Sequence, residues 1–125
     1  MRPRALSLFS GIGGLDLGVE AAGFEVVAQS ETEPYACRVL ARHWPTVLNL
    51  GDVTTITEDT IAEANLGSID LLFGGFPCTD VSRAGKQRGI YAANSGLFFD
   101  LMRVADVVGC RRILLENVST ITSRP

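Results

Sequence analysis

Short apolar runs alternate with amphipathic stretches along the whole chain. Five of these runs have the length and the aliphatic content of strands that are buried in a sheet. The stretches between them carry helix signals, because Gly23 follows the first, Pro34 opens the second and Gly109 follows the third. The pattern predicts strands over residues 5–9, 25–28, 46–50, 69–73 and 112–115, and helices over 15–22, between Pro34 and Pro45, and over 95–108.

Strands that alternate with helices are typical of parallel βαβ units, so the predicted fold class is α/β, with an open, doubly wound, mostly parallel Rossmann-like sheet. A chain of 125 residues without an internal repeat or linker predicts one domain, over residues 1–125. Doubly wound sheets often have about six strands or more. We therefore expect this sheet to be incomplete at its C-terminal side, where a partner chain or a further part of a larger domain covers an apolar edge.

Composition supports a packed core, with 46% hydrophobic and 20% charged residues. No apolar run reaches the length of about 18 residues that a membrane span needs. Residues 1–9 do not resemble a signal peptide. The three cysteines, Cys37, Cys78 and Cys110, are widely spaced and odd in number. This favours reduced thiols in a cytoplasm over a disulfide framework or a metal site. The net charge of −3 is unfavourable for DNA binding, which usually needs a basic face.

A glycine-rich segment, Phe9–Gly18, joins the first predicted strand to the first helix. Glycines at such a turn let the backbone approach a ligand closely. The spacing differs from the dinucleotide fingerprint, which needs glycine where Asp16 stands, and a carboxylate there repels a pyrophosphate. A nucleoside ligand without phosphates therefore fits better, and a simple turn is the alternative interpretation.

Two acids follow the second and third predicted strands. Glu31 lies 20 residues beyond Gly11, where a carboxylate accepts hydrogen bonds from ribose hydroxyls. Asp52 is placed to accept a hydrogen bond from an adenine amino group. The alternative is that both acids are solvated surface residues.

A thiol and a carboxyl group follow the fourth and fifth predicted strands. Cys78 and Glu116 lie just beyond the carboxyl ends of strands that are neighbours in a doubly wound sheet, so both groups open into one cleft. The basic, glycine-punctuated loop 82–89 follows the thiol, and nearby cations activate a cysteine nucleophile. Such a loop can also move and contact phosphates. The alternatives are a solvated loop and an inert thiol, and inert is how we interpret Cys37 and Cys110.

Taken together, these segments resemble the DNA (cytosine-5) methyltransferase family, in the order in which that family has them. Phe9–Gly14 resembles the S-adenosylmethionine loop of the family, 75–78 (Gly-Phe-Pro-Cys) its catalytic motif, and 116–118 (Glu-Asn-Val) the next catalytic motif. Gly85–Gly89 resembles the mobile active-site loop, and Gly96–Phe99 the segment before the following helix. The resemblance covers almost the whole chain, and it is specific because all of the motifs are in register.

The resemblance implies a DNA (cytosine-5) methyltransferase with S-adenosylmethionine as its cofactor and no metal. Cys78 attacks C6 of a flipped-out cytosine, which makes C5 nucleophilic, and Glu116 holds or protonates N3. Pro77 shapes the catalytic loop, and Asn117 belongs to the motif of Glu116. The implied cofactor-binding residues are Phe9, Ser10, Gly11, Gly13, Gly14, Glu31, Thr32, Asp52, Val53, Gly75 and Leu97. The implied DNA-binding residues are Ser82, Lys86, Gln87 and Arg88.

Departures from the family pattern set the alternatives. Thr32 replaces a bulky apolar residue that often stacks on adenine, and Asn94 replaces an arginine. The target-recognition region and the final helix of full members are absent, so we expect double-stranded DNA to bind weakly or only with a complementary chain. The leading hypothesis is the catalytic half of a methyltransferase, split or truncated, in a restriction-modification or phage context.

Two other interpretations belong to different classes of protein. One is a non-catalytic S-adenosylmethionine-binding fragment or subunit that needs a second chain for activity. The other is an NAD-binding or thiol-redox domain, against which the glycine spacing and the absence of a Cys-x-x-Cys pair both count.

Overall fold

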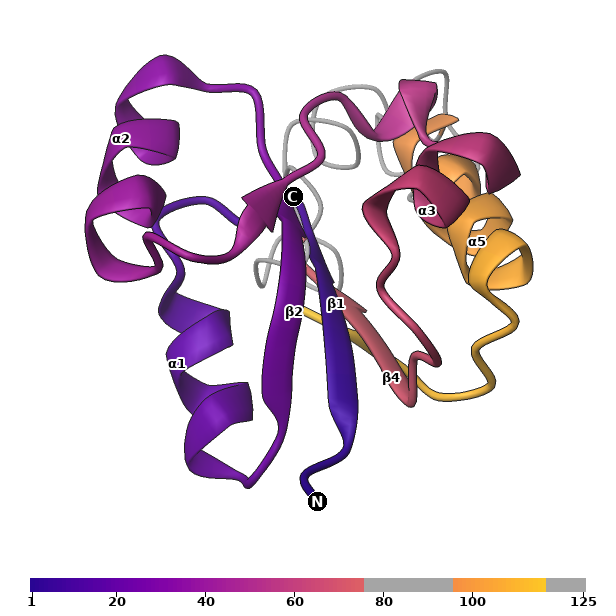
Figure 1. Cartoon of the computed structure of the whole chain (residues 1–125). Helices are drawn as coiled ribbons and strands as arrows, with labels where there is room; N and C mark the ends of the chain where they lie inside the picture. Colours follow the sequence, from indigo (N-terminus) through magenta and orange to yellow (C-terminus); the bar gives the residue numbers. More distant parts are fainter. Residues whose placement is uncertain (76–95, 117–125) are drawn as a thin grey trace, which may run out of the picture.

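The computed structural model describes residues 1–75 and 96–116, which form one parallel sheet between two layers of helices (Figure 1). Within these residues the strand order is β3-β2-β1-β4-β5, and every pair of neighbours is parallel. The chain starts in the centre at β1, builds one edge through β2 and β3, and then crosses to build the other through β4 and β5. The strands are β1 (Arg4–Leu8), β2 (Glu25–Ser30), β3 (Leu48–Asn49), β4 (Leu71–Gly74) and β5 (Ile113–Leu115).

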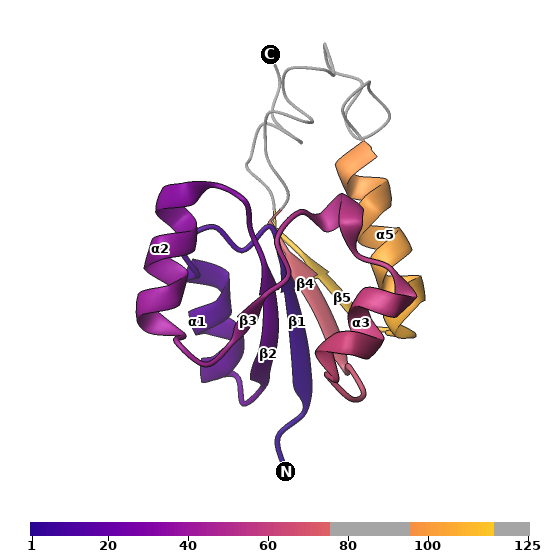
Figure 2. The same ribbon diagram turned by 45° about the horizontal axis from the view of Figure 1, so that its top comes forward.

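Helices cover both faces of the sheet (Figure 2). On one face lie α1 (Gly14–Ala21) and α2 (Pro34–His43), and on the other lie α3 (Glu58–Ala64) and α5 (Gly96–Val108), with the 3₁₀ turn η1 (Val53–Thr55) packed on α5. This confirms the α/β, doubly wound fold class. In such sheets the strand order reverses at a switch point, here between β1 and β4, and ligands bind there beyond the carboxyl ends of the strands.

Alternating side chains divide the core between the two faces. Leu6, Leu8 and Leu72 are fully buried on the α5 face, whereas Ala5 and Phe73 are buried against the layer that holds α1. This period of two is what strands covered on both sides require. Helix α5 packs on the sheet through Leu101, Val104 and Ala105, which are buried.

Apart from shifts of one or two residues at the ends of elements, the structure differs from the predicted elements at three places. The third strand was predicted over 46–50, but only Leu48 and Asn49 pair with β2. The turn η1 and the helix α3 were not predicted, because α3 buries none of its residues fully and its stability comes partly from capping. Thr57 provides that cap by accepting a hydrogen bond from the backbone N–H of Thr60. Among the described residues, no helix is both long and apolar enough to cross a bilayer.

Candidate functional site

The predicted site residues that the structure describes meet at the carboxyl ends of the strands. Phe9, Glu31, Gly75 and Glu116 directly follow β1, β2, β4 and β5. Residues at most of these strand ends line a cavity of about 300 Å³. This volume is at the lower end of the range for small-molecule sites. The cavity is lined by Phe9, Gly11, Ser30, Glu31, Thr32, Gly51, Asp52, Val53, Gly75 and Leu97.

Eight of the eleven predicted cofactor residues line this cavity. Ser10, Gly13 and Gly14 do not, while Ser30 and Gly51 line it without having been predicted. Ser30 and Gly51 each directly precede a predicted acid, and Gly51 has a φ of 81°. The positions after the second and third strands that predicted Glu31 and Asp52 could therefore have predicted Ser30 and Gly51 as well. Among the described residues, the lining holds two carboxylates and no basic side chain, which suits a ligand that donates hydrogen bonds and disfavours a phosphate.

Left-handed backbone shapes the glycine loop. Phe9, Gly11 and Gly13 have φ values of 51°, 59° and 93°. Such a conformation is rare for an aromatic residue and often accompanies a ligand site. A Cβ on Gly13 would lie 2.4 Å from the ring of Trp44, so this glycine allows the loop to pack closely against the end of α2. Gly13 thus serves the packing behind the cavity rather than its wall.

The carboxylate of Glu31 ties the glycine loop to the start of α2. Its Oε1 accepts a hydrogen bond from Gly11 N at 2.8 Å, and its Oε2 accepts from Thr32 N at 3.1 Å and Glu33 N at 2.8 Å. A carboxylate offers about four lone-pair positions. Three of these positions are used here, so about one remains for a ligand. Two ribose hydroxyls would need two.

Asp52 caps η1 at the other side of the cavity. Its Oδ1 accepts from Thr54 N at 2.9 Å and from Thr54 Oγ1 at 2.8 Å. These two hydrogen bonds, the backbone one first, lower the pKa of Asp52, and the side chain is exposed. An ionised acid with one oxygen held and Oδ2 free of described partners is suited to accept a hydrogen bond from an amino group.

A buried polar network lies beneath the loop. Asp16 is fully buried and accepts hydrogen bonds from Ser7 Oγ and Gln29 Nε2, both at 2.9 Å. Ser7 Oγ lies 2.8 Å from Ser10 Oγ, which in turn accepts from Ser30 N at 3.2 Å. Burial raises the pKa of Asp16, although the hydrogen bonds from Gln29 and Ser7 oppose this shift. Asp16 therefore does not face the cavity, and the sequence argument that it repels a pyrophosphate there was wrong.

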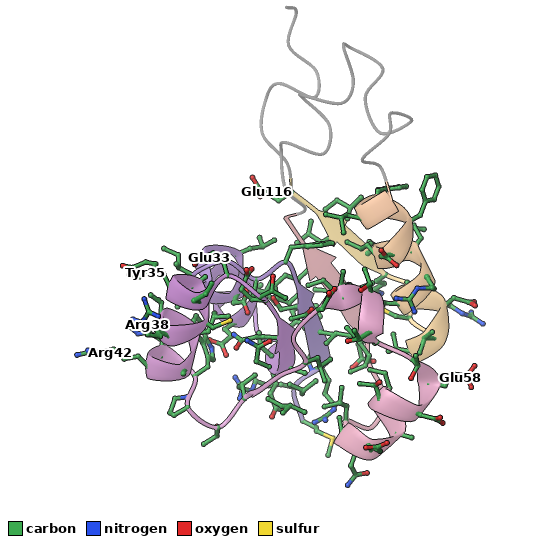
Figure 3. The ribbon with its side chains drawn as sticks, turned by 90° about the horizontal axis from the view of Figure 1, so that it is seen from above. Glu33, Tyr35, Arg38, Arg42, Glu58 and Glu116 are labelled. Atoms are coloured by element: carbon green, nitrogen blue, oxygen red, sulfur yellow. The ribbon has the colours of Figure 1, made fainter. Side chains whose placement is uncertain are left out.

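Glu116 lies over Gly75, where β4 and β5 end side by side. The backbone N–H of Glu116 donates to Gly74 O at 2.9 Å. A Cβ on Gly75 would lie only 2.5 Å from Glu116 Oε1. Figure 3 shows Glu116 at the end of β5. Because Gly75 also lines the cavity, the predicted catalytic carboxylate and the predicted cofactor pocket share one wall.

The remaining predicted residues lie outside the described part of the chain. These are Pro77, Cys78, Ser82, Lys86, Gln87, Arg88 and Asn117. The other two cysteines are described: Cys37 and Cys110 are half-buried free thiols. Each donates a hydrogen bond to a backbone carbonyl, Cys37 to Glu31 O at 3.1 Å and Cys110 to Arg112 O at 3.2 Å.

Comparison with known proteins decides the family. The sequence profile of the C-5 cytosine-specific DNA methylase family matches residues 4–125. The chain belongs to this family. Among curated members, it is 38% identical over 122 residues to the type II methyltransferase M.AquIA of Picosynechococcus sp., covering 94% of this chain and 49% of that protein. It is 43% identical over 117 residues to M.NgoPII of Neisseria gonorrhoeae, covering 93% and 33%.

Solved structures of methyltransferases share the fold of this cytosine methylase chain. A protein described as a DNA modification methyltransferase encoded within an E. coli prophage is 28% identical, with a TM-score of 0.77 over 98% of this chain and 34% of that one. A variant of DNMT2 from Spodoptera frugiperda is 27% identical, with a TM-score of 0.67 over 93% and 35%. The chain spans half or less of the length of these relatives.

Proposed function

We propose that this chain binds S-adenosylmethionine in the cavity and carries the catalytic residues for methylation of C5 of cytosine in DNA. The observation that carries the proposal is the shared wall at Gly75. Gly75 lines the cavity that contains two acids, and it also lies against the carboxylate of Glu116. The cavity lies at the switch point of the sheet, and the proteins similar to this chain are DNA methyltransferases.

The residues present fit the cofactor. The last free lone-pair position of Glu31 would accept a hydrogen bond from one ribose hydroxyl, and Asp52 Oδ2 would accept one from the adenine amino group. Phe9, Val53 and Leu97 provide apolar surface for the purine ring. S-adenosylmethionine, when bound, supplies an electrophilic methyl group. The absence of a basic side chain from the described lining fits a cofactor without phosphates.

Cys78 and Glu116 act on the cytosine ring. The thiolate of Cys78 forms a bond to C6, and the electron pair released raises the nucleophilicity of C5. Glu116 stabilises the charge that builds up on the ring by holding or protonating N3. After methylation, loss of the C5 proton returns electrons that expel the thiolate of Cys78. Cys78 follows Gly75 by three residues, which span at most about 11 Å, so the chain length permits both groups to reach one base.

A complementary part of the enzyme completes the site. On β5, which lies at the edge of the described sheet, Leu114 and Leu115 are 44% and 40% exposed. Exposed aliphatic side chains on an edge strand favour a covering segment. This supports a second candidate role, in which the chain supplies the cofactor-binding half of the site to another polypeptide that carries target recognition. In both roles Ser82, Lys86, Gln87 and Arg88 contact the DNA.

Binding of S-adenosylhomocysteine tests the cofactor site. We expect wild-type protein to bind it in isothermal titration calorimetry, and Glu31→Gln to bind about 10- to 150-fold more weakly, since a hydrogen bond to a charged group contributes about 1.5–3 kcal/mol. Glu63→Gln is the matched control, because Glu63 is an exposed acid on α3 that does not line the cavity. Wild-type affinity in Glu31→Gln, or an equal loss in Glu63→Gln, would refute the assignment.

A further inference from the structure

A second hollow lies at the opposite end of the sheet and is lined by arginines. Its volume is about 530 Å³, and four of the eleven basic residues of the chain, Arg2, Arg4, Arg111 and Arg112, line it. Arg4 begins β1 and Phe9 follows its end, and the five residues of β1 span about 17 Å. The arginine hollow is thus separated from the cofactor cavity by the length of the sheet, on the side where the N-terminus lies (Figure 2).

Three of these arginines have no partner within residues 1–75 and 96–116. Arg4 is engaged, because its guanidinium pairs with Glu25 and donates to Leu66 O. Asp70, the carboxylate in the lining, accepts a hydrogen bond from Arg4 N at 2.8 Å. The side chains of Arg2, Arg111 and Arg112 are exposed and make no ion pair or hydrogen bond in that part of the chain. Gathering like charges in one hollow is unfavourable unless an anion enters it.

The chemistry of the lining favours nucleic acid over protein as the source of that anion. Guanidinium groups bind phosphate oxygens in a bidentate manner. Protein interfaces usually depend on aromatic and apolar anchors, whereas DNA interfaces are more polar and more positive. The lining holds four arginines and no aromatic residue among the described ones. We infer that the arginine hollow is a second DNA-binding site, which holds the phosphate backbone of duplex DNA outside the catalytic cleft.

This inference rests on the proposed function, because it takes its ligand from the DNA on which the enzyme acts. It also addresses the acidic net charge of −3, since four of the eleven basic residues gather in one hollow and make that part of the surface locally basic. Phosphates held in the hollow lie about the length of β1 from the cofactor cavity, so they are not the phosphates that flank a reacting cytosine. The site therefore serves sequence-independent retention on DNA, and not the chemistry.

The salt dependence of DNA binding tests the site. Fluorescence anisotropy of a labelled duplex of about 20 base pairs is measured between about 50 and 200 mM salt, and each phosphate contact contributes about 0.9 to the slope of log K against log salt. We expect Arg111→Gln/Arg112→Gln to reduce that slope by about 1.8 and Arg2→Gln, which lies ahead of β1, to reduce it by about 0.9. The matched control is Arg38→Gln/Arg42→Gln on the exposed face of α2 (Figure 3), which removes the same charge and is expected to leave the slope unchanged.

Several results would overturn the inference. One is an unchanged salt slope in both hollow variants, and another is an equal reduction of the slope in the α2 control. A third is displacement of the duplex by polyglutamate as effectively as by unlabelled DNA, which would indicate an acidic protein partner. S-adenosylhomocysteine affinity is measured on the same preparations. If the hollow variants bind S-adenosylhomocysteine and their salt slope is unchanged, the second DNA-binding site alone is refuted. If wild-type protein does not bind S-adenosylhomocysteine, the proposed function is refuted.

Discussion

Replacing Gly75 by alanine tests whether Glu116 lies where the structure places it. The new methyl group would lie 2.5 Å from Glu116 Oε1, whereas ordinary contacts are about 3.5 Å, so the carboxylate must move by about 1 Å. Glu116 is exposed and its carboxylate is the far end of a flexible side chain, so we expect the free energy of unfolding to change by no more than about 0.5 kcal/mol. A displacement of about 1 Å in a catalytic group reduces kcat by about 100-fold.

Gly74→Ala is the matched comparison, one residue earlier. Its methyl group would lie 2.7 Å from the backbone oxygen of Leu8 and 3.3 Å from Leu101 Cδ1, and neither neighbour can swing away. We expect this variant to lose about 1–3 kcal/mol of stability through overpacking. Urea unfolding followed by the fluorescence of Trp44, the single tryptophan, gives the stability, and methyl incorporation into duplex DNA gives kcat. Wild-type kcat in Gly75→Ala, or equal destabilisation of the two variants, would refute the placement of Glu116.

Two further predictions concern the glycine loop and the buried polar network beneath it. Gly13→Ala places a methyl group 2.4 Å from the Trp44 ring at a φ of 93°, so we expect a loss of about 2–4 kcal/mol in urea unfolding, and unchanged stability would contradict the packing of the loop on α2. Asp16 has a pKa above its usual 3.8, so its contribution to stability is fully present below pH 3.8 and is lost as the pH rises through the raised pKa. The stability of wild type relative to Asp16→Asn should therefore fall as the pH rises from 3.8, and a constant difference across that range would contradict a raised pKa.

The sequence predicted the fold because apolar periodicity and helix-end signals agreed at most elements. Helix α2, for example, begins at Pro34 and ends at His43, before Pro45. Elements with few buried residues left a weaker apolar pattern in the sequence, as α3 did with no fully buried residue. The two-residue β3 was overestimated because Val47 and Leu50 pack as apolar residues outside the strand.

The candidate site was predictable as far as spacing determines which residues end a strand. Glu31 and Asp52 both line the cavity, as expected from their positions after β2 and β3. The burial of Asp16, in the first turn of α1, was not predictable, because it depends on Ser7 from β1 and Gln29 from β2 meeting beneath the loop. The roles of Cys78 and of the basic loop remain predictions from the sequence.

The central claim, that Cys78 and Glu116 act on cytosine beside the cofactor cavity, is tested most directly by a covalent trap. The protein is incubated with S-adenosylmethionine and long duplex DNA that contains 5-fluorocytosine, and the products are separated on a denaturing gel. Fluorine cannot leave C5 as the proton does, so the bond between Cys78 and C6 persists. We predict a shifted protein–DNA band in wild type that is absent from Cys78→Ala. Methylation of ordinary DNA without such a band, or a band that persists in Cys78→Ala, would contradict the account.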